Sequence, residues 1–314
     1  MRFFALLLLV AAAARADQND LELWRLGHPD DLACTRCDGL AGDSIEPGTI
    51  DAQARFHRLT SALGLAFAPP FQETAGSLGE SGFELGISSQ QVFLSNMPAD
   101  TWATQGTQAT SAAPKVLVLP TLTLRKGLGA SLELGAAVSW LANSQIAGLS
   151  AEARWAVLDG MGSAPDFALR GWATRIVGAR DLDLTSGGAD AMVSKSFGLA
   201  GMAKLQPYAQ GGIAFVNAIS SVIDFKPNRT VQQFDRQNAV NPTASEGVFR
   251  NVSFFKNRFL RAALGVRLVA GAAVFGLEGA LAQGTNDIQE SPPPGTPQQF
   301  VRVWSGAARI GFNY

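Results

Sequence analysis

The sequence predicts an all-β fold, a transmembrane antiparallel up-and-down β-barrel of 10 or 12 strands. Stretches of about ten to sixteen residues alternate apolar with small or polar side chains from about residue 115 to the end of the chain. Globular domains use strands of about 5 or 6 residues, whereas a tilted strand needs about 9 to 11 to cross the hydrocarbon. Only 16% of the residues are charged, against about 25% in soluble domains, which indicates less surface in contact with bulk water.

The first residues predict export from the cytoplasm. Arg2 precedes an apolar run that continues to Ala14, and residues 14–16 read Ala-Arg-Ala, a small-residue cleavage pattern. The run is shorter than the roughly 20 residues that a transmembrane helix requires. We therefore expect residues 1–16 to be a cleaved signal peptide and the mature protein to lie in an oxidising compartment.

The alternation has period two, which is the period of a β-strand. In residues 128–140 the even positions hold Leu, Ala, Val and Trp, and the odd ones hold Gly, Ser, Ala and Glu133. The same division recurs in residues 149–157, 205–215, 260–268 and 273–281. Soluble sandwiches also alternate, so the length of the segments is what favours a membrane barrel.

The last predicted strand has a specific ending. Trp304, Ile310, Phe312 and Tyr314 share one face, and the sequence stops at the aromatic residue. This pattern, with the glycine-rich alternating strands over about 200 residues, resembles bacterial outer-membrane β-barrel proteins, although it matches no characterised subfamily. The resemblance implies a location in the outer membrane of a Gram-negative bacterium, contact with its lipid, and an assembly signal at Ile310, Phe312 and Tyr314 read by the barrel assembly machinery.

Counting strands back from a periplasmic C-terminus gives alternating short and long connections, as in bacterial barrels. The ten predicted strands are 82–94, 114–125, 128–141, 147–158, 166–178, 183–197, 203–219, 254–269, 272–284 and 299–314. The predicted external connections are 95–113, 142–146, 179–182, 220–253 and 285–298, and two predicted periplasmic turns are Lys126-Gly127 and Ala270-Gly271. The short connection at 179–182 fits this pattern least well.

The segment before the strands is predicted to be a separate part of the molecule. We expect residues 17–68 to form an N-terminal periplasmic or lumen segment and residues 69–314 to form the barrel domain. Residues 56–68 have two interpretations: Phe56, Leu59 and Leu63 have helical spacing, but the segment also alternates weakly. A strand there would need a further partner and would raise the total to twelve.

Two cysteines form a C-x-x-C pair, Cys34 and Cys37. Asp38 follows where c-type haem attachment needs histidine, and a zinc site would need two further ligands. We therefore predict a local disulfide, with free thiols as the alternative, and neither metal nor cofactor.

Catalysis and nucleic-acid binding are not predicted. The two histidines, His28 and His57, both precede the main strands, so the barrel wall holds no nucleophile with a histidine base. The formal net charge of −1 gives no basic footprint for nucleic acid. The sequence indicates a protein that is not an enzyme.

Charged residues on the polar faces of the strands are the candidate functional set. These lumen-lining charges are Glu133, Glu152, Arg154, Arg170, Arg261, Arg267, Glu278 and Arg309. In an open lumen they would select small polar or charged solutes, which predicts a small porin-like channel. In a packed lumen they would fill and rigidify the barrel. The alternative function is a non-conducting structural or surface-interaction barrel that acts through its external loops.

Overall fold

The structure is a computed structural model. It describes residues 19–29, 51–94, 102, 115–160, 164–199, 203–227, 230–233, 235, 245–288 and 299–314. The predicted signal peptide, the Cys34–Cys37 pair and almost all of the predicted connection 95–113 lie outside these residues. No helix within the described ranges is both long and apolar enough to cross a bilayer.

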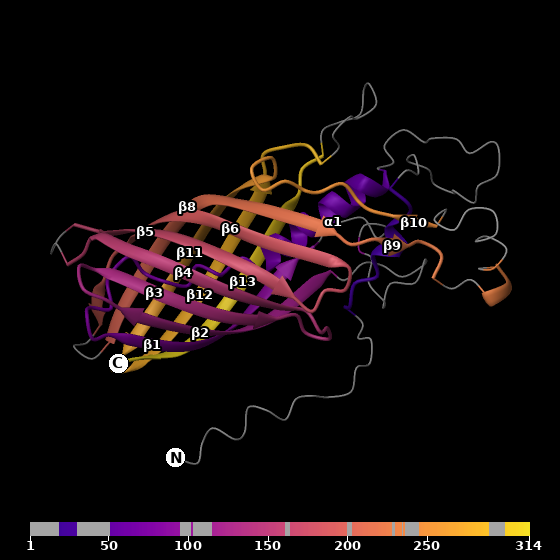
Figure 1. Ribbon diagram of the computed structural model, residues 1–314. Coiled ribbons are helices and arrows are strands. Elements are labelled where there is room, and N and C mark those ends of the chain that lie inside the picture. Colours follow the sequence, from indigo (N-terminus) through magenta and orange to yellow (C-terminus); the bar gives the residue numbers. More distant parts are fainter. Residues whose placement is uncertain are drawn as a thin grey trace, which may run out of the picture.

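Ten antiparallel strands form the barrel (Figure 1). They are β1 (Phe83–Phe93), β2 (Val116–Gly127), β3 (Leu132–Trp140), β4 (Ala147–Leu158), β5 (Asp166–Val177), β6 (Leu182–Ser194), β8 (Ala203–Ser220), β11 (Arg258–Ala270), β12 (Ala273–Gly284) and β13 (Arg302–Asn313). The short strand β7 (Phe197–Leu199) pairs only with β8, and β9 (Ile223–Asp224) pairs with β10 (Glu246–Gly247) outside the barrel.

The sheet closes because the first and last strands pair. Strand β1 pairs with β13 from Glu84 and Asn313 onward, and Phe83 and Tyr314, the residue after β13, exchange backbone hydrogen bonds of 2.7 and 2.8 Å. Strand β8 pairs with β11 across the longest connection. Closure leaves no strand edge unpaired, which is what a sheet in hydrocarbon requires. The predicted all-β, up-and-down barrel is confirmed, with ten strands.

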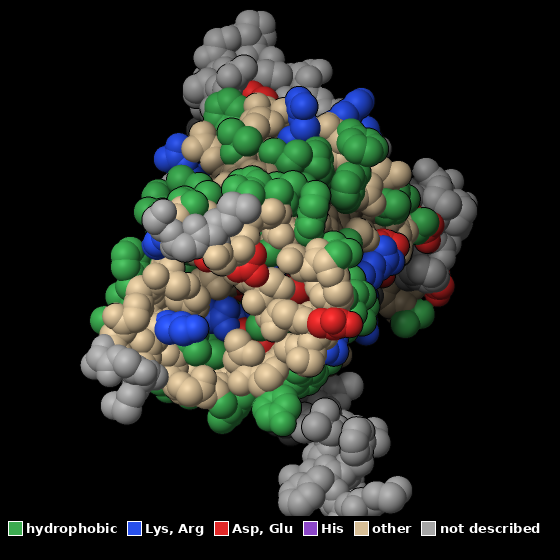
Figure 2. Space-filling view, turned by 90° about the vertical axis from the view of Figure 1, so that its left-hand side faces the viewer, with side chains coloured by type: hydrophobic (Ala, Val, Ile, Leu, Met, Phe, Trp, Pro, Cys, Tyr) green, Lys and Arg blue, Asp and Glu red, His purple; other side chains and the backbone are tan. Residues whose placement is uncertain are grey.

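The outer face of the barrel is apolar and the inner face is polar. Leu264, Leu277 and Ile310 are 70%, 62% and 59% exposed, whereas charged side chains on the intervening positions are buried. Seen from the end where the C-terminus lies, hydrophobic side chains surround the outside and charged ones lie within the ring (Figure 2). The alternation in the sequence therefore separates a lipid-facing from a lumen-facing surface.

One predicted turn is wrong by a few residues. The turn expected at Lys126-Gly127 lies instead at residues 128–131, so β2 continues to Gly127 and β3 begins at Leu132. Ala130 and Ser131 have φ of 59° and 58°, a left-handed conformation that these residues seldom adopt. Gly271, with φ of 60°, supplies the same geometry in the β11–β12 turn at residues 271–272, one residue from the predicted position.

Helix α1 (Ala52–Ala66) covers most of residues 56–68, which the sequence allowed to be either a helix or a strand. Asp51 caps it by accepting a 2.6 Å hydrogen bond from the Ala54 amide, as N-cap residues do. Almost every side chain of the helix is buried, and it packs against β6, β8 and β13 inside the barrel. The segment is therefore a helix, which leaves the barrel with ten strands rather than twelve.

Residues 19–26 lie at the opposite end of the barrel from the C-terminus. The Asn19 amide donates to the Asn143 carbonyl at 2.9 Å, and Asp20 accepts from Ser144 and Gln145 in the β3–β4 connection. A 3-10 helix, η1 (Leu23–Leu26), follows. This end carries the long connections, which in bacterial barrels face outward.

Candidate functional site

The lumen is filled by the chain itself. We call α1 together with the extended residues 67–78 the plug. Phe56, Leu59 and Leu63 of α1 have no exposed surface. A Cβ on Gly64 would lie 2.6 Å from Val216 Cγ1, so a glycine lets the helix approach the wall this closely. The outward-facing half of the lumen thus contains a packed hydrophobic core.

Polar groups of α1 connect it to the external connections. Gln53 exchanges two hydrogen bonds with the Arg250 backbone, at 3.0 and 2.8 Å. His57 contacts the Ile288 carbonyl through Nδ1 and Asn257 Oδ1 through Nε2, both at 3.0 Å. Phe56 stacks on Phe249 with ring centroids 4.6 Å apart. The plug and the external connections therefore form one packed unit.

The extended part of the plug has no strand partner, so the wall must satisfy its backbone groups. Its carbonyl oxygens accept from arginine side chains. These bonds join Pro69 to Arg261 at 2.9 Å, Pro70 to Arg170 at 3.3 Å, Gly76 to Arg154 at 2.7 Å, and Thr74 to Arg154. Each guanidinium carries five donors in a fixed fork, which suits it to this task.

The amides of the same stretch donate mainly to carboxylates. Phe71 donates to Glu278 at 3.1 Å, Gln72 to Glu278, Leu78 to Glu133 at 2.6 Å, Ser77 to Asp159 at 3.0 Å, and Ala75 to the Ser194 hydroxyl at 2.9 Å. Bonds to charged groups contribute about 1.5–3 kcal/mol each, roughly twice the neutral value. The charged wall therefore matches an extended polypeptide, amide to anion and carbonyl to cation.

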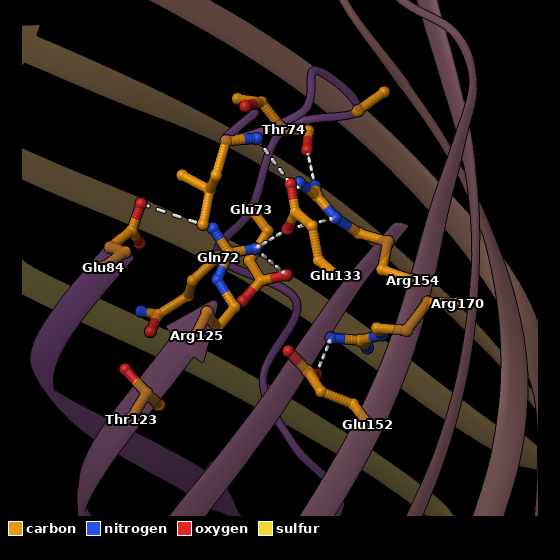
Figure 3. Close-up of polar contacts among 12 residues, drawn as sticks. Gln72, Glu73, Thr74, Glu84, Thr123, Arg125, Glu133, Glu152, Arg154 and Arg170 are labelled. Carbon is orange, nitrogen blue, oxygen red and sulfur yellow. Dashed lines mark hydrogen bonds and ion pairs between the residues drawn. The ribbon is translucent and has the colours of Figure 1, made fainter. Parts of the chain in front are cut away.

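Glu73 is the plug's own charged residue in this region (Figure 3). Its carboxylate lies 2.6 Å from Arg125 and 3.7 Å from Arg309. Arg125 also lies 3.3 Å from Glu84 and 3.6 Å from Glu133. One plug carboxylate thus joins a cluster of charges contributed by several strands.

A second cluster surrounds Phe71. Arg170 pairs with Asp190 at 2.8 Å and with Glu152 at 3.4 Å. The guanidiniums of Arg170 and Arg261 lie 5.0 and 4.3 Å from the centre of the Phe71 ring, within range of a cation–π contact. This aromatic ring fixes the plug between two wall arginines.

The charges of these clusters balance. We call the combined set the lumen network; it holds six carboxylates, Glu73, Glu84, Glu133, Glu152, Asp190 and Glu278, and six guanidiniums, Arg125, Arg154, Arg170, Arg261, Arg267 and Arg309. Without Glu73 the wall members alone would carry one excess positive charge. By formal charge, Glu73 therefore balances the lumen network, while the plug as a whole fills the lumen.

The structure places all eight lumen-lining residues singled out from the sequence on the inner face, within this network. The sequence analysis missed Glu73, Glu84, Arg125 and Asp190. Strand alternation could have identified the last three, since each shares a face with small or polar residues. Ile310, Phe312 and Tyr314 lie on the outer face, and Tyr314 is 95% exposed.

A narrow gap remains between the plug and strands β2–β4. Thr123, Ala137, Ser150 and Glu152 are half-buried there, and the cavity beside them measures about 20 Å³. That volume holds about one water molecule. Within the described residues no group of three or more His, Cys, Asp or Glu side chains is placed to bind a metal ion.

A closed antiparallel barrel with an apolar exterior and a charged interior is the architecture of bacterial outer-membrane β-barrels. Several solved structures are similar. The N-terminal barrel domain of Pseudomonas aeruginosa OprF is 13% identical with a TM-score of 0.26, over 75% of this chain and 99% of that one. OprG from the same organism is 11% identical with a TM-score of 0.29, over 77% and 99%. The translocator domain of autotransporter NalP from Neisseria meningitidis is 10% identical with a TM-score of 0.30, over 74% and 88%.

No protein-family model and no curated protein matches the chain.

Proposed function

We propose that this protein is a plugged, non-conducting barrel of the outer membrane that presents its external connections and N-terminal segment at the cell surface. The filling of the lumen carries the proposal. Both halves of the plug are buried, and five wall charges that could line a pore are bound to the plug's backbone: Arg154, Arg170, Arg261, Glu133 and Glu278.

The external end supports a role at the surface. Gln53 and His57 join α1 to the connections that contain Arg250 and Ile288, and Asp20 joins the N-terminal segment to the β3–β4 connection. Such contacts fix the described parts of these connections, which lowers the entropic cost of binding a partner. The predicted connection 220–253 is the longest, and we assign it the main contact surface.

A gated channel for small polar or charged solutes is the second candidate. The gap beside β2–β4 favours it, because small side chains at Ala137 and Ser150 leave room there for solvent if the plug shifts. In this case the plug would have to detach from Arg154 and Glu278 before solutes could pass.

Planar bilayer recordings test the proposal. We expect the full chain to give no discrete conductance and a chain lacking residues 52–78 to give stable steps, since removal of the plug leaves a ten-stranded pore. Heat-dependent migration on a detergent gel checks that both barrels are folded. Steady conductance by the full chain would refute the proposal and favour the channel.

A further inference from the structure

The outer rim of the barrel carries an aromatic and basic patch beside β8, β11 and β13. We call it the rim patch; its members are Phe215, Phe254, Phe255, Lys256, Arg258 and Arg302. Phe215 lies on the outer face of β8, because its neighbours Ala214 and Val216 are buried on the inner face.

Residues 253–257 form a turn that places aromatic side chains outside the barrel. Phe254 stacks on Phe215 with ring centroids 5.4 Å apart, and Phe255 meets Phe254 edge-on at 5.7 Å. Phe255 is 77% exposed. The turn is fixed from inside, because the Asn257 side chain donates to Ser61 of α1 at 2.9 Å. An exposed aromatic group is thus held rigidly at the rim.

Three cations lie on this part of the rim: Lys256 follows Phe255, Arg258 is the β11 partner of Phe215, and Arg302 lies on β13, two strands from Arg258. Lys256, Arg258 and Arg302 are exposed, and within the described part of the chain none of them forms an ion pair. By contrast, Arg175 and Asp183, also at the external end, pair with each other. Arg302 makes only a neutral contact, a 3.1 Å hydrogen bond to Gln283. The rim patch is therefore positively charged.

The cations stand at the edge of the apolar outer face. Leu260 follows Arg258 by two residues and Trp304 follows Arg302 by two, both outward-facing and 58% and 49% exposed. Two residues of strand span about 7 Å. The charges thus lie at headgroup level when the apolar side chains are in acyl chains. Arg258 on β11 and Arg302 on β13 are separated by strand β12, so their strands lie about 10 Å apart across the sheet.

We propose that the rim patch binds a phosphorylated glycolipid of the outer leaflet. Its phosphates contact Lys256, Arg258 and Arg302, its acyl chains cover Leu260 and Trp304, and Phe255 lies at the polar boundary. The external position selects the outer leaflet, and separated cations suit a headgroup with two phosphates better than one with a single phosphate. This site is independent of whether the barrel conducts or binds a partner through its connections.

Native mass spectrometry of the full chain in detergent tests the site, with bisphosphorylated lipid A as the probe. Each basic side chain near a charged headgroup contributes about fivefold in affinity, so the double variant Arg258→Gln with Arg302→Gln should bind lipid A about thirtyfold more weakly. The matched control is Lys126→Gln with Lys195→Gln, which removes two positive charges at the opposite end of the barrel and should change binding less than twofold.

Dephosphorylated lipid A and phosphatidylglycerol serve as comparison ligands, and both should bind at least tenfold more weakly than bisphosphorylated lipid A. Unchanged binding by the Arg258 and Arg302 variant would overturn the proposal. Equal binding of phosphatidylglycerol would also overturn it, because the patch would then attract any anionic lipid. Heat-dependent gel migration of each variant confirms that the barrel is folded.

Discussion

The substitution Glu73→Gln tests whether charge holds the plug in the lumen. Glu73 is 4% exposed and pairs with Arg125 and Arg309. Removing one partner of a buried pair costs about 3–5 kcal/mol. Arg125 keeps Glu84 and Glu133 within 3.6 Å, and glutamine can still accept a hydrogen bond, so we expect a loss of about 2 kcal/mol in plug stability.

Hydrogen exchange of the plug amides measures this loss. Phe71, Gln72 and Leu78 donate to wall carboxylates, so their exchange requires the plug to open locally. Since about 1.4 kcal/mol is a factor of ten, their exchange should accelerate about 30-fold while amides in β12 stay unchanged. Glu80→Gln is the matched control, because Glu80, like Glu73, precedes strand β1 but is exposed. An acceleration below threefold at Glu73→Gln, or equal effects of the two variants, would refute the reasoning.

Three further changes have defined outcomes. Gly64→Ala forces a methyl group against Val216. Overpacking costs about 1–3 kcal/mol, and the better helix propensity of alanine offsets about 1 kcal/mol of this. Urea unfolding in micelles should therefore show a free energy of unfolding lower by about 1 kcal/mol, which a second substitution, Val216→Ala, restores. His57→Phe removes the imidazole contacts to the Ile288 carbonyl and to Asn257 Oδ1; a hydrogen bond there contributes about 1 kcal/mol, so the Ile288 amide should exchange about fivefold faster. Tyr314→Ala should leave unfolding almost unchanged but lower the folded protein in outer-membrane fractions several-fold, as the resemblance to outer-membrane barrels implies.

Matched controls separate these effects from general instability. Gly171→Ala adds a methyl group where nothing lies within 4 Å and should cost less than about 0.5 kcal/mol. His28→Phe changes a histidine whose ring contacts the Glu246 carbonyl, so Ile288 exchange should not respond. Asn313→Ser alters the penultimate residue but keeps the terminal aromatic side chain. If a control matched its test variant, the corresponding specific contact would not be the cause.

The strands could be predicted because their physics is local and repetitive. A residue such as Leu264 or Leu277 faces lipid because of its parity along the strand, and closure of the barrel does not change that parity. The same rule placed Arg261 and Glu278 in the lumen. The error at Lys126-Gly127 arose because Ala130 and Ser131 adopt a conformation that their side chains do not indicate.

The plug could not be predicted in the same way. Residues 67–78 have no periodicity, since their hydrogen-bond partners are side chains of distant strands rather than neighbouring backbone. Pro69 and Pro70 indicate an extended chain, but nothing local indicates that Arg261 and Arg170 donate hydrogen bonds to their carbonyl oxygens. Glu73 is one acidic residue in a short polar stretch until the fold brings Arg125 beside it.

The path of the chain through the barrel constrains the order in which the protein assembles. Residues 19–26 lie at one end of the barrel, whereas β1 begins at the other end. Residues 67–82 therefore run along the lumen to reach β1. With β1 and β13 paired, the gap between the plug and strands β2–β4 measures about 20 Å³, which is too small to admit further polypeptide. We therefore expect the plug to enter the lumen before the first and last strands pair.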